Sequence, residues 1–209
     1  QEPEVLVLDE PTSFLDIRHK LELLAILKDM VRTRHLAVLM SLHELDLAQK
    51  VSDYVVCVRG DAVERQGPPE EIFTPDYIMS LYGAARGSYN ALFGSLELEA
   101  VSGAPEVFVI GGGGAGIPAY RKLQRQGVPF AAGVLQENDL DYPAAQALAA
   151  EIVSEEPFQP VGEASFRQAA EIMARCRRVL CPVERFGPMN EKNRLLRRMA
   201  EEAGKLDVG

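Results

Sequence analysis

Short apolar runs alternate with stretches of helical periodicity along this chain, and this alternation constrains the fold more than any other feature. In a first segment, the strand-like runs are residues 5–8 and 36–40. Between them, apolar residues from Ile17 to Val31 recur at helical spacing, and Asp16 is placed to cap the helix. Strands joined by crossover helices pair in parallel, with helices on the faces of the sheet. The sequence therefore predicts an α/β fold.

The rest of the chain extends this pattern. A hairpin is expected over 54–64 and a helix opening at Pro68-Pro69, and after a less regular stretch near 84–89 the alternation resumes. We therefore expect two domains, residues 1–84 and 85–209, the second a small Rossmann-like parallel α/β domain. Its expected strands are 96–101, 107–110, 130–135 and 179–183. Its expected helices are 118–126, 144–152 with Asp141 as part of the cap, 163–175 and 190–203.

Composition limits the classes of partner that this chain can have. The net charge of -9 argues against a nucleic-acid partner, because such a surface repels phosphates and the basic residues form no segregated patch. No apolar run approaches the roughly 18 residues needed to span a bilayer, so membrane contact is expected only through a partner protein. The three cysteines have no metal-ligand spacing and are expected to be buried, reduced thiols of a cytosolic protein.

Two acids and a histidine follow the first two predicted strands. Asp9 and Glu10 come directly after residues 5–8, and His43 comes shortly after residues 36–40. Parallel strands end at the same edge of a sheet, so these three side chains are expected to converge where ligands bind in open α/β folds. Asp9 suits a Mg²⁺ ion, Glu10 could deprotonate an attacking water, and a neutral His43 could donate a hydrogen bond to a γ-phosphate.

These residues strongly resemble the ATPase subunits of ABC transporters. The run VLVLDE is similar to the Walker B strand with its catalytic glutamate, SFLD to the D-loop, and LMSLHELDLA to the switch-histidine segment. The later VRGDAVERQGPPEEIF resembles the hairpin and helix that close this nucleotide-binding domain. The sequence around DIRHKLELL is most similar to that of the ATPase subunits of importers of iron chelates, haem and cobalamin. Phe14 departs from the small residue common at its place in the D-loop.

The resemblance implies a function for the whole protein: ATP hydrolysis with Mg²⁺ as cofactor, coupled to import of an iron complex or cobalamin. Asp9 would hold Mg²⁺, Glu10 would polarise the attacking water and His43 would sense the γ-phosphate. Ser13 and Asp16 of the D-loop would face a second ATPase subunit in a head-to-tail dimer. The partners implied are that subunit and the membrane permease, so the protein would be cytoplasmic and peripheral to the inner face of the plasma membrane.

Motifs that precede the Walker B strand in this family are missing from the sequence. There is no GxxxxGK[ST] phosphate loop, which supplies most of the grip on phosphate, and no Q-loop or LSGGQ-like signature. We expect the chain to be the C-terminal part of a longer protein, beginning just after the signature helix. On its own it is predicted to be inactive toward ATP.

A glycine string marks the second domain. Gly111, Gly113 and Gly116 stand in GxGxxG register between a predicted strand and helix, where backbone amides can approach a phosphate. Acids a little over twenty residues later, Glu137 and Asp139, lie roughly where a ribose-binding acid would sit in a dinucleotide fold. A nucleotide or another small anionic ligand is the functional interpretation. A structural turn without any ligand is the alternative.

Two further functions stay open at this point. The chain could be a non-enzymatic regulatory or ligand-binding protein that uses the Rossmann-like domain and keeps an ATPase remnant. It could also be a nicotinamide-dependent oxidoreductase, although no catalytic residue set for that chemistry is found. The runs GSLELEAVSGAPEVFVIGGGGAG and PFAAGVLQENDLDY resemble C-terminal extensions of some iron-complex importer ATPases, which implies kinship and no known activity.

Overall fold

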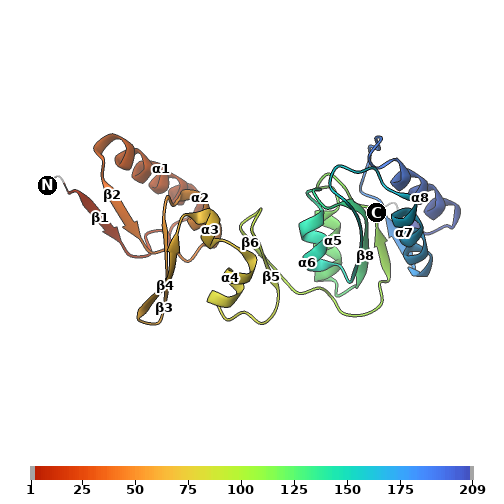
Figure 1. The fold of residues 1–209 in the computed structure, drawn as a ribbon, viewed down its shortest axis with the longest axis horizontal. Coiled ribbons are helices and arrows are strands. Elements are labelled where there is room, and N and C mark those ends of the chain that lie inside the picture. Colours follow the sequence, from red (N-terminus) through yellow and green to blue (C-terminus); the bar gives the residue numbers. More distant parts are fainter. Residues whose placement is uncertain (1–2, 208–209) are drawn as a thin grey trace. The chain divides into compact units, whose positions relative to one another are not determined.

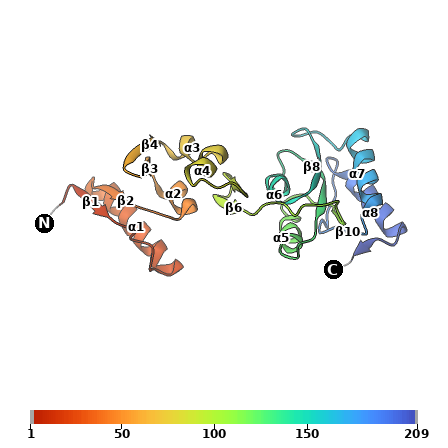
Figure 2. The same cartoon turned by 90° about the horizontal axis from the view of Figure 1, so that it is seen from below.

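The computed structural model describes residues 3–207, and these form two compact units. Unit 1 runs to Ala84 and also includes Ala91–Ser95, whereas unit 2 comprises Ala85–Asn90 and the chain from Leu96 onward. Figures 1 and 2 show the elements of each unit from two directions. Within the described residues, no helix is long and apolar enough to cross a bilayer.

Unit 1 contains a parallel strand pair joined by a helix. Strands β1 (Val5–Leu8) and β2 (Ala37–Met40) pair in parallel with Leu8 opposite Met40. The crossover is helix α1 (Ile17–Arg34), whose N-cap Asp16 accepts a hydrogen bond from the backbone N–H of His19 at 3.0 Å. The predicted parallel α/β arrangement and the cap are confirmed.

One face of this strand pair is uncovered in the described chain. Residues alternate between exposed and partly buried along both strands, and the exposed positions include Val5, Val7 and Leu39. Val7 is 68% exposed. Apolar side chains in a β-strand normally pack against another layer. This exposed face is therefore of the kind that another layer of structure usually buries.

The remainder of unit 1 is a hairpin flanked by short helices. Gly60, at a φ of +63°, makes the turn between antiparallel strands β3 and β4, as the Arg59-Gly60-Asp61 sequence predicts. The small core here includes Ile72, Phe73 and Ile78. The elements are α2 (Leu45–Val51), β3 (Val55–Arg59), β4 (Ala62–Gly67), α3 (Pro69–Ile72) and α4 (Pro75–Leu81).

Unit 2 is built on a five-stranded parallel sheet with strand order β11-β10-β7-β8-β9. Numbered from β7, this order is 3-2-1-4-5, the order of a doubly wound nucleotide-binding fold, with its switch point between β7 and β10. The predicted Rossmann-like α/β class is therefore confirmed. The strands are β7 (Val107–Val109), β8 (Phe130–Gln136), β9 (Glu151–Glu155), β10 (Arg178–Leu180) and β11 (Leu206–Asp207).

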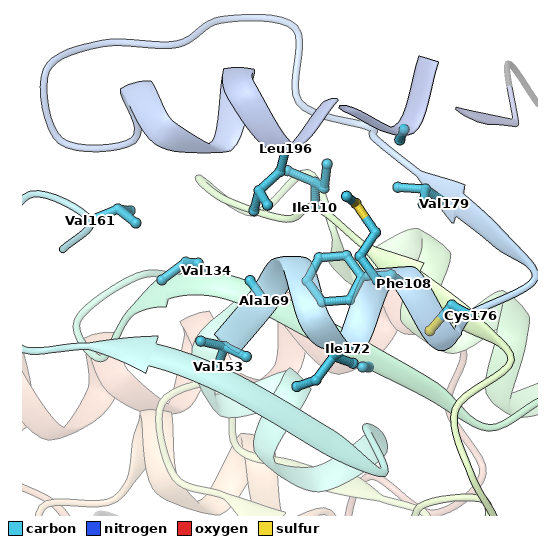
Figure 3. Close-up of a cluster of buried hydrophobic side chains, with 13 residues drawn as sticks. Phe108, Ile110, Val134, Val153, Val161, Ala169, Ile172, Cys176, Val179 and Leu196 are labelled. Carbon is cyan, nitrogen blue, oxygen red and sulfur yellow. The ribbon is translucent and has the colours of Figure 1, made fainter. Parts of the chain in front are cut away.

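Helices cover both faces of this sheet, α5 and α6 on one side and α7 and α8 on the other (Figure 1). The α7 and α8 side buries a cluster centred on Phe108, Ile172 and Leu196, which Figure 3 shows at close range. The opposite side buries a second cluster in which Tyr120 stacks on Phe130 with ring centroids 5.2 Å apart. The helices are α5 (Ile117–Arg125), α6 (Tyr142–Leu148), α7 (Glu163–Arg175) and α8 (Glu191–Glu202).

Two expectations about unit 2 are wrong, and one strand was not predicted. The helix predicted over 144–152 ends at Leu148, because Glu151–Glu155 instead forms β9 beside β8. The strand predicted over 96–101 shrinks to β6 (Ser95–Glu97), which pairs with β5 (Ser88–Asn90) and stays outside the five-stranded sheet. In this short strand the buried side chain is Glu97, which forms an ion pair with Arg121 at 2.6 Å. Strand β11 was not predicted, since two residues give no periodicity.

A buried asparagine of α8 hydrogen-bonds the interior strand β8. The register between β8 and β9 shifts between Ala132 and Leu135, and Asn193 serves the backbone of Val134 within this interval. Its side-chain oxygen accepts from Val134 N–H at 3.3 Å and its amide donates to Val134 C=O at 2.9 Å. Asn193 is 1% exposed, so water cannot replace these bonds.

Replacing Asn193 by alanine should therefore lower the free energy of unfolding of unit 2 by about 2 kcal/mol, because two buried backbone groups lose their partner. Denaturant unfolding followed by circular dichroism measures the change. Arg198→Ala, at an exposed position of the same helix, is the matched control and should shift stability by no more than about 0.5 kcal/mol. Equal effects of the two substitutions would contradict this role of Asn193.

Candidate functional site

The structure brings the predicted acids and histidine of unit 1 together. Asp9 and Glu10 leave the carboxyl end of β1, and His43 follows the carboxyl end of the parallel strand β2. The imidazole Nε2 of His43 lies 2.6 Å from Oε1 of Glu10. Both side chains are open to solvent, with that of His43 72% exposed. A carboxylate and an imidazole thus meet at an accessible sheet edge.

Serine hydroxyls connect this pair to Asp9. The hydroxyl of Ser41, the first residue after β2, donates to Oδ1 of Asp9 at 2.7 Å and accepts from the backbone N–H of Glu10 at 2.7 Å. Ser13 donates from its hydroxyl to Oε2 of Glu10 at 3.0 Å. Sequence reasoning gave Ser41 no role. The available signal was its position, since it follows β2 directly as Asp9 follows β1.

Mutual polarisation shifts the titration of the pair. The hydrogen bond to His43, together with one from Ser13, lowers the pKa of Glu10 below its ordinary value. The same bond to Glu10 raises the pKa of His43 above its ordinary value of 6.5. The ion pair therefore stabilises the fold between the lowered pKa of Glu10 and the raised pKa of His43. Its contribution is lost as pH falls through the first or rises through the second.

A second layer of contacts holds the segment between β1 and α1. The buried hydroxyl of Thr12 donates to Oε2 of Glu44 at 2.8 Å, and Lys20 of α1 pairs with the other oxygen of Glu44. These bonds lower the pKa of Glu44. Asp16 caps α1 and contacts the ring of His19 at 2.9 Å. The predicted contact of Ser13 and Asp16 with a second subunit stays a prediction.

The donor set at this edge fits the metal that the resemblance implies. Mg²⁺ prefers oxygen ligands and is commonly held by one or two carboxylates together with water and phosphate. Asp9 is exposed and has one carboxylate oxygen bonded to Ser41 in the structure. No group of three or more His, Cys, Asp or Glu side chains suited to a metal occurs in residues 3–207. Asp9 would thus supply one ligand, and Mg²⁺ would supply charge neutralisation for phosphate.

In unit 2, the glycine loop between β7 and α5 already holds an anionic group of the chain itself. The carboxylate of Asp141 accepts backbone hydrogen bonds from Gly112 at 2.5 Å, Gly116 at 2.9 Å and Ile117 at 3.2 Å. Asp139 accepts from Gly113 N–H at 2.9 Å through both oxygens. Two aspartates of the chain thus bond the amides of Gly112, Gly113 and Gly116. Binding of a nucleotide or anion at Gly111, Gly113 and Gly116 stays a prediction.

Burial of Asp141 has consequences for its own chemistry and for its predicted cap. Its residue is fully buried, and desolvation raises its pKa even though the bonds from the glycine loop act in the opposite direction. Although Asp141 stands at the N-cap position of α6, its side chain makes no cap bond there. The aspartate is aimed at the N-terminus of α5, a contact that local sequence could not reveal.

Packing explains two of the three motif glycines without any ligand. A Cβ atom added to Gly111 or Gly116 would lie within 3.0 Å of both the Tyr120 hydroxyl oxygen and a carboxylate oxygen of Asp141. Gly113 differs, since its φ of +66° requires glycine while its Cβ direction faces open space. Tyr120 is fully buried, and its hydroxyl has no hydrogen-bond partner among the described residues.

Comparison with known proteins adds the family context. A sequence profile of the MJ0874 family matches residues 130–207, within unit 2. The uncharacterized ABC transporter ATP-binding protein MJ0873 of Methanocaldococcus jannaschii is 36% identical over 59% of this chain and 43% of its own length. The cobalamin import ATP-binding protein BtuD of Halobacterium salinarum is 32% identical over 76% of this chain and 42% of its own length. The ferric enterobactin transport ATP-binding protein FepC of Escherichia coli is 35% identical over 40% and 31%.

The homologues of this chain are therefore ATP-binding proteins of ABC transporters, which confirms the resemblance carried by the Walker B, D-loop and switch-histidine motifs. The chain spans about two fifths of the length of the first two relatives. Their matches cover more of this chain than unit 1 contains, so the similarity extends into unit 2.

The pairing of His43 with Glu10 predicts a measurable titration. In the folded chain, the pKa of His43 should lie above 6.5, and Glu10→Gln should lower it toward that ordinary value because the carboxylate that favours the imidazolium is gone. NMR titration of the imidazole carbon-bound protons measures both values. Glu22→Gln, an exposed acid on α1, is the control. A His43 pKa insensitive to Glu10→Gln would contradict the contact.

Steric packing at Gly116 predicts a loss of stability. Gly116→Ala should destabilise unit 2 by about 1 to 3 kcal/mol, because its φ of -75° is unstrained and the cost comes from overpacking against Tyr120 and Asp141. Thermal or denaturant unfolding measures this cost. Gly187→Ala, with no atom within 4 Å of the added Cβ, is the matched control. Wild-type stability of Gly116→Ala would refute the packing account.

Proposed function

We propose that unit 1 is the hydrolytic edge of an ABC-type ATPase. In this proposal Glu10 orients and deprotonates the attacking water, His43 hydrogen-bonds the γ-phosphate and Asp9 holds Mg²⁺. The observation that carries the proposal is the 2.6 Å contact between Glu10 and His43 beside Asp9, at the carboxyl edge of two parallel strands. An imidazole that moves from Glu10 to a phosphate would free the carboxylate to act as a base.

The rest of the nucleotide site is proposed to come from polypeptide that this sequence does not contain. Its 209 residues include no GxxxxGK[ST] phosphate loop, and the first relatives are more than twice as long as the matched region. The uncovered apolar face of β1 and β2 supports the same view, because further strands or helices of an ATPase domain would bury it.

The transport role is proposed from the relatives of this chain. Proteins that serve cobalamin and ferric enterobactin transport match this chain, so we propose an importer of an iron complex or cobalamin. A second ATPase subunit, contacted through Ser13 and Asp16, and a membrane permease would be its partners. The protein would then act at the inner face of the plasma membrane, attached through the permease.

A second candidate role belongs to unit 2, as a regulatory ligand-binding domain. The observation that favours it is a pocket of about 310 Å³ formed by the loops that follow β7, β8, β9 and β10. Ligands bind at this carboxyl edge in doubly wound folds. Such a domain could serve an importer or act without hydrolysis.

The 209-residue polypeptide is predicted to bind Mg-ATP too weakly to detect, because most of the phosphate grip resides in the missing loop. Isothermal titration calorimetry measures this directly, and micromolar affinity would overturn the prediction. The same absence predicts no measurable ATP hydrolysis by the polypeptide.

Joining the chain to the phosphate-loop portion of a relative should restore hydrolysis, and this hybrid tests the role of Glu10. Glu10→Gln should then lower the steady-state rate by about 10² to 10⁴-fold, the usual effect of losing a general base. Glu22→Gln should leave the rate unchanged. A hybrid that hydrolyses ATP equally well with Glu10→Gln would refute the assignment.

A further inference from the structure

The pocket of unit 2 lies beside the glycine loop and is lined by seven residues from four loops and strand ends. Four of these anchor the argument: Gly113 after β7, Asp139 after β8, Phe158 after β9 and Met189 after β10. Because all four strands are parallel, these segments meet at one edge of the sheet. The volume of about 310 Å³ is at the lower end of the range for small-molecule sites.

Apolar side chains line this pocket while remaining exposed. Leu140, Phe158 and Met189 are all solvent-exposed, and Phe158 is 77% exposed. The backbone of Phe158 has a φ of +62°, a conformation that bulky residues rarely adopt, and Asn138 accepts its N–H at 3.2 Å. Strained residues of this kind cluster at ligand sites, where the surrounding structure holds them in place. The phenyl ring is thus presented to solvent beside the polar groups of the pocket.

Hydrogen bonds from Gln136 hold two of the loops that form the pocket. The side-chain amide of Gln136 donates to Met189 C=O at 3.0 Å and to Gln159 C=O at 3.3 Å, which ties together the loops that carry Met189 and Phe158. Met189 C=O also accepts from Val161 N–H at 3.0 Å. The loops that carry the apolar side chains are therefore held in fixed relation to β8.

Charge in this pocket is negative. Among its lining residues in the described chain, Asp139 carries the only formal charge, and no lysine or arginine contributes. Asp139 accepts from Gly113 N–H through both oxygens and from Asp141 N–H through Oδ1 at 2.8 Å. A carboxylate offers about four acceptor positions, so one remains for a ligand. Asp141, which accepts from Gly112 and Gly116, is buried and does not line the pocket.

We propose that this pocket binds a small organic cation, an ammonium group carried on an apolar body. The free acceptor position of Asp139 would take an N–H of the cation, and the exposed ring of Phe158 would attract its charge. Leu140 and Met189 would contact the apolar body. Phosphates and other anions are disfavoured because Asp139 would repel them and the amides of Gly112, Gly113 and Gly116 are already bonded to carboxylates. This inference rests on the ligand-binding role of unit 2 and is independent of hydrolysis by unit 1.

Three probes of one shape and different charge test the proposal: benzylammonium, benzyl alcohol and benzoate. Titrations of the full chain followed by ¹H–¹⁵N NMR should show saturable shifts at Gly113, Asp139 and Phe158 with benzylammonium. Benzyl alcohol should bind about tenfold more weakly, and benzoate should leave these resonances unchanged. Ammonium binding no tighter than alcohol binding, or shifts confined to other residues, overturns the proposal.

Substitutions in the pocket separate the contribution of the Asp139 charge from that of the Phe158 ring. Asp139→Asn should weaken benzylammonium binding about tenfold while leaving benzyl alcohol binding unchanged. Glu171→Gln, at an exposed acid of α7 outside the lining, is the matched control and should change neither affinity. Phe158→Leu keeps the apolar contact and removes the ring, so it should weaken the ammonium more than the alcohol and serves if Asp139→Asn unfolds.

The outcomes also distinguish the ligand class from the ligand-binding role. Binding of the alcohol or benzoate at these residues without the ammonium would refute the cation while leaving a ligand-binding role for unit 2. Failure of all three probes to bind at the pocket would refute both. Unchanged ammonium affinity in Asp139→Asn and Phe158→Leu would overturn the proposed contacts.

Discussion

Leu8 lies opposite Met40 in the parallel pair β1 and β2, so the residues that follow them leave the sheet side by side. Everything proposed for unit 1 depends on this register. It places the Ser41 hydroxyl between the Asp9 carboxylate and the Glu10 backbone, and it lets His43 reach Glu10. Antiparallel pairing would send the two ends to opposite edges and separate the acids from the imidazole. Glu44 then holds the segment between β1 and α1 in place through its bonds with Thr12 and Lys20.

In unit 2 the residues that follow parallel strands also meet at one edge of the sheet, but the groups that meet there are different. Its glycine loop follows the first strand of a doubly wound sheet, where the amides of a helix N-terminus ordinarily face a phosphate. Here the carboxylate of Asp141 fills that position from the loop after β8. A buried carboxyl group bonded by backbone amides stabilises the turn internally, and Gly111 and Gly116 allow close packing against Tyr120. The open part of the edge is then left to Asp139 and the apolar side chains around it.

The sequence predicted those features that depend on residues close together in the chain, such as strand positions, a helix cap and the alternation of strands and helices. The apolar runs gave the strand positions in unit 1, the Asp16 cap gave the start of α1, and strand–helix alternation gave the parallel class of unit 2. Convergence of Asp9, Glu10 and His43 followed from parallel pairing alone. The alanine-rich stretch before Ile152 favoured a longer helix by propensity, but pairing with β8 made residues 151–155 a strand.

Long-range contacts account for what the sequence could not reveal. Asp141 is 25 residues from Gly116 and turns toward it instead of capping its own helix. The pocket combines loops after four different strands, and the outward ring of Phe158 depends on a positive φ that no residue pattern announces. Contact between Ser41 and Asp9 likewise spans 32 positions. Each feature is fixed by strand order and register, which emerge only when the sheet assembles.

A double-mutant cycle on Glu10 and His43 tests the central claim most directly, because it asks whether the two side chains act at one site. The steady-state rate of ATP hydrolysis would be measured in the hybrid that carries a phosphate-loop portion, for Glu10→Gln, His43→Ala and the double variant. Residues that act as a unit give strongly non-additive losses. The account predicts that the double variant is about as slow as the slower single variant. Losses that multiply independently would contradict it.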